Sequence, residues 1–132
     1  MKIIRWLDKH PFVKYRLPVY ALVLLIFLTS VMPGSLIKVG LKDPSMLNFN
    51  YLHLTAYFVL GYYMSIALIN SKKISLKKHN YYFTILFCFL FGFFNEIIQH
   101  FVPDRYFGIL DIYYNLIGIL LSQLFVLALY KK

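Results

Sequence analysis

Hydrophobic residues gather in four long runs along the chain, and most of the polar residues fall between them. The runs cover residues 17–32, 52–69, 81–101 and 109–130. An α-helix rises 1.5 Å per residue, so about 20 apolar residues cross the hydrocarbon core of a bilayer. Backbone polar groups must be paired in lipid, and a helix pairs them within one segment. The pattern therefore predicts an all-α integral membrane bundle of four transmembrane helices in a single domain, residues 1–132.

Composition agrees with this prediction. Hydrophobic residues make up 61% of the 132 residues and charged residues only 14%, whereas a soluble domain carries about 25% charged residues. Pro18 suits the opening turn of the first run, and no small-residue cleavage site follows that run closely, so we expect it to be retained. Cys88 is the single cysteine, which excludes an internal disulfide. We expect it to be a small buried hydrophobic residue.

The basic residues predict an orientation in the membrane. The formal net charge is +9, but the basic residues flank apolar runs and accompany no recognition motif, so we expect no nucleic-acid partner. With both termini inside, the inner segments carry 11 basic residues, and the outer loops carry only Lys38, Lys42 and Arg105. The positive-inside rule therefore predicts a multi-pass protein of the cell membrane with cytoplasmic termini, and with loops 33–51 and 102–108 facing outward.

Polar residues inside the runs form stripes at helical spacing. The members of each stripe share one helix face: His53 and Tyr57 in the second run; Glu96, Gln99, His100 and Pro103 in the third; Asp111, Asn115, Gly118 and Ser122 in the fourth. All three stripes lie near the predicted outer surface. Polar groups inside a membrane are expensive and indicate either a functional site or helix–helix adhesion. The small residues of the fourth run predict that a neighbouring helix approaches it closely.

Together the stripes predict a polar pocket that opens outward and is walled by the second, third and fourth helices. The short connection 102–108 makes the third and fourth helices antiparallel neighbours and places Arg105 above the acids. In the alternative interpretation the polar groups only hold the bundle together, with Arg105 paired to Glu96 or Asp111. His100 fits either the pocket or the lipid headgroups. We expect the phenylalanine-rich segment 87–94 to face lipid and pack helices.

The segment 96–118, EIIQHFVPDRYFGILDIYYNLIG, resembles the signature of the VanZ-like family, E-x-x-Q-x-x-x-P-x-R-x-x-x-x-x-D-x-x-x-N-x-x-G. The matching positions are Glu96, Gln99, Pro103, Arg105, Asp111, Asn115 and Gly118. Of the family's D-K-x-x-H element only His53 is present, because Phe49 and Asn50 replace the Asp-Lys pair. The resemblance implies a small helical membrane protein and a link to low-level resistance to the glycopeptide antibiotic teicoplanin. It does not imply a defined reaction.

A second likeness concerns the spacing of three of these residues. Arg105, Asp111 and Asn115 copy the spacing of the R-x-x-x-x-x-H-x-x-x-D element of type-2 phosphatidic-acid phosphatases. In those enzymes the histidine is the nucleophile. Asp111 stands in its place here, so catalysis would need His53 or Asp111 as nucleophile, or a water activated by a carboxylate.

Three hypotheses of function follow. In the first, the pocket binds the headgroup of an anionic lipid or of a cell-envelope precursor. In the second, the chain is a lipid-phosphate phosphohydrolase or transferase, and in the third it is a non-catalytic structural or shielding protein. The candidate catalytic residues are His53, Glu96 and Asp111, and the candidate substrate-binding residues are Arg105, Gln99, Asn115 and Tyr57. Their spacing matches no recognised metal-ligand motif, so we expect no metal and no other cofactor. The pattern leaves open whether the chain is an enzyme and whether it forms oligomers.

Overall fold

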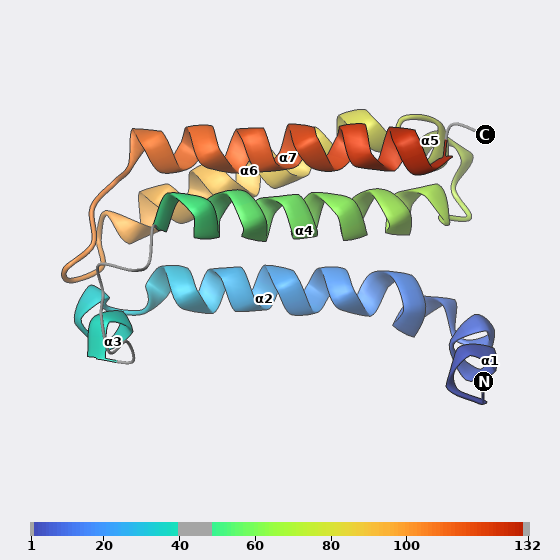
Figure 1. The fold of residues 1–132 in the computed structure, drawn as a ribbon, viewed down its shortest axis with the longest axis horizontal. Helices are drawn as coiled ribbons and strands as arrows, with labels where there is room; N and C mark the ends of the chain where they lie inside the picture. Colours follow the sequence, from blue (N-terminus) through green and yellow to red (C-terminus); the bar gives the residue numbers. More distant parts are fainter. Residues whose placement is uncertain (1, 40–48, 131–132) are drawn as a thin grey trace.

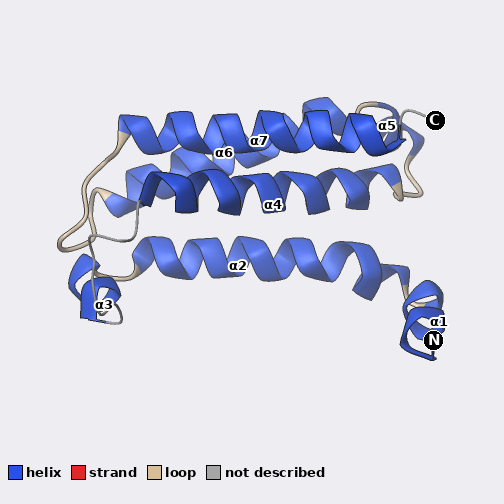
Figure 2. Cartoon of the chain, in the orientation of Figure 1, coloured by secondary structure: helices blue, strands red, loops and turns tan. Residues whose placement is uncertain are grey.

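A computed structural model describes residues 2–39 and 49–130 of the chain, with side chains described over 5–36 and 50–130. Lys42 of the predicted outer loop lies outside the described residues, and the side chains of Lys38 and Phe49 lie outside the described side chains. Over the described ranges all regular secondary structure is helical (Figure 2), which agrees with the predicted all-α class.

Four helical segments are long and apolar enough to cross a membrane, as predicted. They are α2 (Leu17–Val31) with the preceding turn η1 (Phe12–Arg16), α4 (Phe49–Ile69), α6 (Asn80–Gln99) and α7 (Ile109–Tyr130). Three shorter helices lie between or before them: α1 (Lys2–Lys9), α3 (Gly34–Val39) and α5 (Ile74–Lys78).

Helix α4 begins at Phe49 rather than residue 52, and two other helix ends that differ from the prediction lie near a proline. The first span begins at Phe12 rather than residue 17, because η1 is a π-helical turn that runs into α2. Pro18 has no N–H to give the carbonyl of Lys14 and its ring crowds that carbonyl, which explains the widened turn. The third span ends at Gln99 rather than residue 101, since the residue before Pro103 disfavours helical backbone angles.

The helices form a bundle in which α4, α6 and α7 lie together and α2 runs along one side (Figure 1). Helices α1 and α5 and the last turn of α7 lie at one end of the bundle, which we call the α5 end. Helix α3 and the loop between α6 and α7 lie at the opposite, α3 end. The first and last described helical residues therefore share one end, as four antiparallel crossings require. That this end is cytoplasmic stays a prediction.

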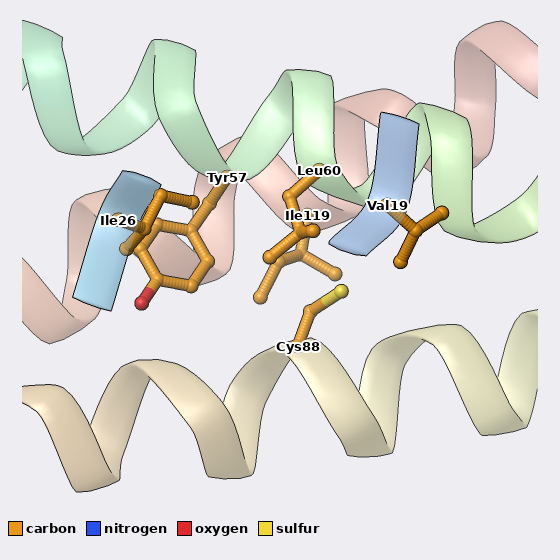
Figure 3. Close-up of a cluster of buried hydrophobic side chains, with 6 residues drawn as sticks. All are labelled: Val19, Ile26, Tyr57, Leu60, Cys88 and Ile119. Carbon is orange, nitrogen blue, oxygen red and sulfur yellow. The ribbon is translucent and has the colours of Figure 1, made fainter. Parts of the chain in front are cut away.

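The apolar centre of the bundle is small. It contains Val19, Ile26, Tyr57, Leu60, Cys88 and Ile119 (Figure 3). Cys88 is fully buried, as expected. The buried face of α6 is otherwise made of small or polar residues, while Phe87, Phe93 and Phe94 are each at least 40% exposed. These three phenylalanines thus lie on the outside of the bundle, where we expect lipid, while Phe89 and Phe91 pack against the core and the polar side of α6 faces the bundle.

Small residues bring α4 and α7 into backbone contact. A Cβ atom added at Gly118 would lie closer than 3.0 Å to the carbonyl oxygen of Leu54 and 3.0 Å from the backbone nitrogen of Phe58. One turn further on, Gly61 of α4 faces the hydroxyl of Ser122 in the same way. The prediction that Gly118 and Ser122 permit a close approach is therefore confirmed.

A buried hydrogen-bond network joins α4, α6 and α7 nearer the α5 end. The hydroxyl of Ser65 donates to Gln123 Oε1 at 2.8 Å and lies 3.1 Å from the hydroxyl of Thr84. Helix α2 is held less firmly, because only Val19, Ile26 and Ser30 of its residues are buried. Helices α4, α6 and α7 are thus the rigid part of the fold, and α2 packs against them.

Candidate functional site

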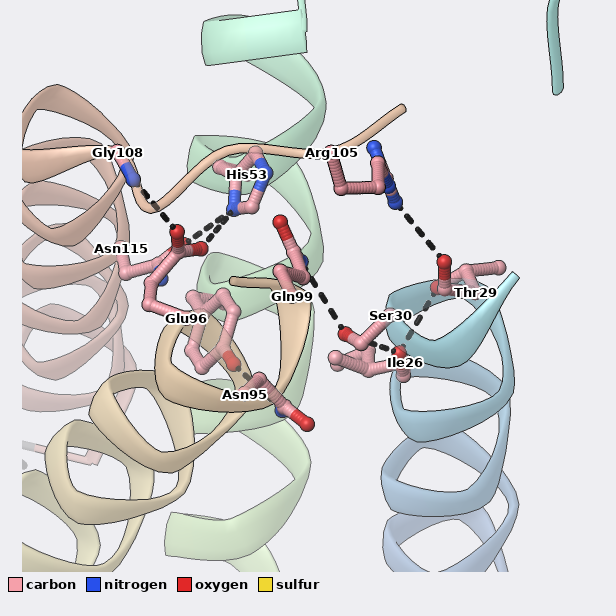
Figure 4. Close-up of polar contacts among 11 residues, drawn as sticks. Ile26, Thr29, Ser30, His53, Asn95, Glu96, Gln99, Arg105, Gly108 and Asn115 are labelled. Atoms are coloured by element: carbon pink, nitrogen blue, oxygen red, sulfur yellow. Dashed lines mark hydrogen bonds and ion pairs between the residues drawn. The ribbon is translucent and has the colours of Figure 1, made fainter. Parts of the chain in front are cut away.

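Four polar residues meet at the α3 end, and we call them the polar cluster: His53, Glu96, Asp111 and Asn115. Figure 4 shows His53, Glu96 and Asn115. They converge because His53 follows the start of α4, Glu96 precedes the end of α6, and Asp111 lies in the first turn of α7. One ligand atom from each of His53, Glu96 and Asp111 lies within 4.8 Å of the other two. The structure therefore brings the three candidate catalytic residues together.

Glu96 is the most deeply buried member of the polar cluster, with an exposed fraction of 0%. Its Oε2 accepts a hydrogen bond of 3.2 Å from the backbone N–H of Gly108 in the α6–α7 loop. Its Oε1 has no hydrogen-bond partner among the described residues. A buried carboxylate is costly unless it is paired, so the free oxygen marks a position for a further binding partner.

His53 stands between the acid and the amide of the polar cluster. Its Nδ1 lies 3.0 Å from Asn115 Oδ1 and 3.7 Å from Glu96 Oε1. In the neutral ring a proton on Nδ1 donates to Asn115, which leaves Nε2 as an acceptor. Asn115 thus fixes the ring, as a positioning residue would.

Arg105 lies on the α6–α7 loop and is half-buried. One guanidinium nitrogen donates to the carbonyl oxygen of Thr29 in α2 at 2.9 Å, and Nε has no partner among the described residues. Among the described residues, Arg105 makes no ion pair with Glu96 or Asp111. The ion pair of the alternative interpretation is therefore not formed. Burial lowers the pKa of Arg105 and the two carboxylates oppose that change, but a guanidinium stays charged in proteins.

A cavity of about 480 Å³ opens between α2, α4 and α6 at this end. We call it the α2–α4–α6 cavity. Its polar lining consists of Thr29, Ser30, His53, Tyr57, Asn95, Glu96, Gln99 and Arg105. Its apolar lining consists of Leu25, Ile26, Met32, Leu52 and Ala56.

The walls of this cavity differ from the predicted ones. The second and third spans contribute as predicted, but the remaining wall is α2 and not the fourth span. Asp111 and Asn115 are absent from its lining. From α7, Asn115 contacts His53 and Asp111 lies within 4.8 Å of His53 and Glu96. The prediction failed here because helix spacing shows which residues share a face but not which helix packs against that face.

Several polar contacts hold the cavity wall (Figure 4). The Tyr57 hydroxyl accepts a hydrogen bond of 3.2 Å from Asn95 Nδ2. Gln99 Nε2 donates to the Ser30 hydroxyl at 3.4 Å, which ties α6 to α2. Neither Ser30 nor Asn95 was among the predicted site residues. The sequence did contain a signal for each: Ser30 is a hydroxyl residue inside the first apolar run, and Asn95 is an amide residue next to Glu96.

His100 lies outside the cavity. Its side chain is exposed, and its ring meets that of Phe101 edge-on with centroids 5.4 Å apart. His100 is therefore not part of the pocket, and its contact with lipid headgroups stays a prediction.

The cavity wall carries three buried polar atoms without hydrogen-bond partners among the described residues. They are Asn95 Oδ1, Glu96 Oε1 and Arg105 Nε. Buried polar atoms in folded proteins are almost always paired with protein, water or ligand. The wall thus offers two acceptors and one cationic donor to a molecule in the cavity.

Four apolar helices and a polar cluster buried at one end of their bundle define a polytopic helical membrane protein. The family model described as VanZ/LLP1 matches residues 6–130, nearly the whole chain, and the chain belongs to this family. This confirms the family resemblance of the segment 96–118. Searches of curated proteins and of solved structures gave no match to the chain.

Proposed function

We propose that the α2–α4–α6 cavity binds the anionic headgroup of a membrane lipid or of a lipid-linked cell-envelope precursor. The main support is that one cavity combines an apolar wall with a cationic donor, Arg105 Nε, and two acceptors, Asn95 Oδ1 and Glu96 Oε1, that have no hydrogen-bond partner among the described residues. Its volume of about 480 Å³ lies within the range of small-molecule sites. The polar end suits a headgroup, and the apolar residues of α2 and α4 suit the start of an acyl or isoprenyl chain.

Arg105 is the phosphate-binding residue in this proposal. Its guanidinium already donates to Thr29, and the remaining donors include the buried Nε. Guanidinium–phosphate hydrogen bonds are charge-assisted and about twice as strong as neutral ones. A bound phosphate would therefore accept hydrogen bonds from the guanidinium donors of Arg105 that have no partner among the described residues.

Glu96 adds a second requirement on the headgroup. A carboxylate repels a phosphate, so Glu96 Oε1 is suited to a hydroxyl or ammonium donor on the same ligand. Asn95 Oδ1 is a further acceptor for such a donor. Tyr57 and Gln99 line the same wall and hold it in place through Asn95 and Ser30. The favoured ligand thus carries both a phosphate and a hydrogen-bond donor.

Native mass spectrometry of the purified protein tests this proposal. We expect a co-purified or added phospholipid or undecaprenyl phosphate to remain bound to wild type. Arg105→Ala should weaken that binding at least about tenfold, since a hydrogen bond to a charged group contributes about 1.5–3 kcal/mol. Arg5→Ala is the matched control, because Arg5 is an exposed arginine of α1. Equal lipid retention in both variants would remove the phosphate role of Arg105.

We also propose that the chain lies in the cell membrane, with the α3 end facing outward. The headgroup would then come from the outer leaflet, where glycopeptide antibiotics meet cell-wall precursors. The family's link to teicoplanin resistance makes antibiotic susceptibility a direct test of this part. Expression in a teicoplanin-susceptible host should raise the inhibitory concentration for wild type and not for Arg105→Ala. No difference between wild type and an empty vector would reject the link.

A lipid-phosphate phosphohydrolase is the second candidate, favoured by the meeting of His53, Glu96 and Asp111. A water activated by one of these groups would attack phosphorus, the bond to the lipid oxygen would break, and that oxygen would take up a proton. Phosphate release from lipid phosphates should then be lost in both His53→Ala and Asp111→Asn. If folded wild type turns over none of the lipid phosphates tested, the enzymatic hypothesis is rejected and headgroup binding remains. If the protein also binds no lipid, only the non-catalytic structural role remains.

A further inference from the structure

We propose that His53, Glu96 and Asp111 bind a divalent transition-metal ion, Zn²⁺ or Mn²⁺, with Asn115 Oδ1 as a fourth ligand. Three different helices supply the proposed nitrogen and carboxylate ligands, and one ligand atom from each lies within 4.8 Å of the others. The site adjoins the proposed headgroup site and shares Glu96 Oε1 with it, so a bound ion would leave Asn95 Oδ1 as the acceptor for a donor group of the headgroup.

The distances suit ligands of a common ion. Bonds from such ions to nitrogen and oxygen are about 2.0–2.2 Å long, which places neighbouring ligands about 3–4 Å apart. His53 Nδ1 lies 3.7 Å from Glu96 Oε1 and 3.0 Å from Asn115 Oδ1. The inference requires a rotation of the Asp111 side chain, which is only half-buried, to bring its carboxylate to bonding distance. When Nδ1 loses its proton to solvent and binds the ion, Asn115 Oδ1 is already beside it.

The charges at the site call for a cation. Two carboxylates stand close together, and Glu96 is fully buried with Oε1 unpartnered among the described residues. The nearest guanidinium, Arg105, is directed to the carbonyl of Thr29. A half-buried carboxylate beside a fully buried one is unfavourable, and Arg105 attracts both electrostatically but forms no ion pair with either among the described residues. A divalent ion at the polar cluster would neutralise both carboxylates and occupy the free oxygen of Glu96.

The donor set indicates the kind of ion. One imidazole nitrogen with carboxylate and amide oxygens suits Zn²⁺ or Mn²⁺, whereas sites made only of oxygen suit Mg²⁺ or Ca²⁺. The sequence analysis expected no metal because it relied on ligands spaced along one segment. Here His53, Glu96 and Asp111 come from three different helices, so no local spacing reveals them.

Metal content of the protein tests this inference. The chain is purified with an affinity tag free of histidine, and bound metal is measured by inductively coupled plasma mass spectrometry before and after chelation and reloading with ZnCl₂ or MnCl₂. We expect about one ion per chain in wild type. Asp111→Asn keeps the size of the side chain but removes its charge, and it should lower the bound metal at least tenfold.

Two exposed residues at the same end provide matched controls. Asp104→Asn removes an acid outside the polar cluster, on a backbone with φ of 59° that asparagine also adopts. His100→Ala removes an imidazole outside it. Both variants should keep about one ion per chain. Loss of metal in the controls equal to that in Asp111→Asn, or retention in all three variants, would overturn the inference.

A second measurement does not depend on the folding of any variant. Chelated wild type titrated with ZnCl₂ or MnCl₂ should show a saturable rise in its unfolding temperature, because an ion that binds only the folded state stabilises it. No rise with either ion would reject the site. The outcome is distinguishable from that of the headgroup proposal, since Arg105→Ala should lose lipid and keep metal, while a folded Asp111→Asn should lose metal.

Discussion

The closest approach between α4 and α7 gives the sharpest prediction about stability. Replacing Gly118 by alanine places a methyl group closer than 3.0 Å to the carbonyl oxygen of Leu54 and 3.0 Å from the nitrogen of Phe58. Both atoms belong to the backbone of α4, so no side chain can move aside. The two helices must separate instead.

The size of the effect follows from that separation. Ordinary contact begins at 3.4 Å, so the helices must move apart by roughly 0.5–1 Å, a gap that loses a quarter to a half of each dispersion contact. Overpacking of this kind costs about 1–3 kcal/mol. The same movement pulls His53, which adjoins Leu54, away from Asn115 and lengthens their 3.0 Å contact. Gly118→Ala should therefore lower both the stability and the ligand occupancy of the site.

Thermal unfolding in detergent, followed by fluorescence-detected size-exclusion chromatography, measures this effect. Gly118→Ala should lower the unfolding temperature by at least about 3 °C. Gly61→Ala is the comparison variant, because its added methyl group meets the side chain of Ser122, which can adjust more readily than a helix backbone. A Gly118→Ala protein as stable as wild type, or less affected than Gly61→Ala, would refute the close-packing argument.

Three further predictions concern other parts of the bundle. Gly34→Ala should weaken the packing of α3 against the α6–α7 loop, because the new Cβ would collide with the backbone carbonyl of Asp104. We expect faster proteolysis at the α3 end than in the control Ser35→Ala. Unchanged cleavage would argue against this packing. Ser65→Ala should cost about 1–3 kcal/mol by leaving Gln123 Oε1 without its buried donor; a thermal stability equal to that of wild type would contradict this. A membrane-impermeant thiol reagent added to intact cells should label Asp104→Cys and not Lys73→Cys, both at exposed positions; the reverse pattern would invert the proposed orientation.

The helices were predictable because each span is a long apolar run in which lipid leaves the backbone no alternative to helix. The polar stripe of α7 was predictable for a similar reason, since Asn115, Gly118 and Ser122 recur at helical spacing and all three are buried. The boundary errors at the start of the first span and the end of the third arose from local backbone effects at Pro18 and Pro103, which a hydropathy pattern does not register.

The site was harder to predict because it depends on packing between helices. Spacing grouped Glu96 with Gln99 correctly, and both line the cavity. It did not show that α2 supplies a wall, because Ser30 is a single hydroxyl in an apolar run. Nor did it show that the Arg105 guanidinium binds a backbone carbonyl of α2, since a backbone group of a distant helix leaves no signature in the sequence.

If the α2–α4–α6 cavity binds a lipid headgroup as proposed, the small number of buried residues on α2 has a consequence for which lipids it would accept. Inside a bilayer, helix–helix contacts and helix–lipid contacts are similar in energy for apolar side chains. A hydrocarbon tail can therefore replace part of the α2 packing at little cost, while α4, α6 and α7 keep their polar groups in register. Selectivity would then be strict for the headgroup and tolerant of tail length and branching.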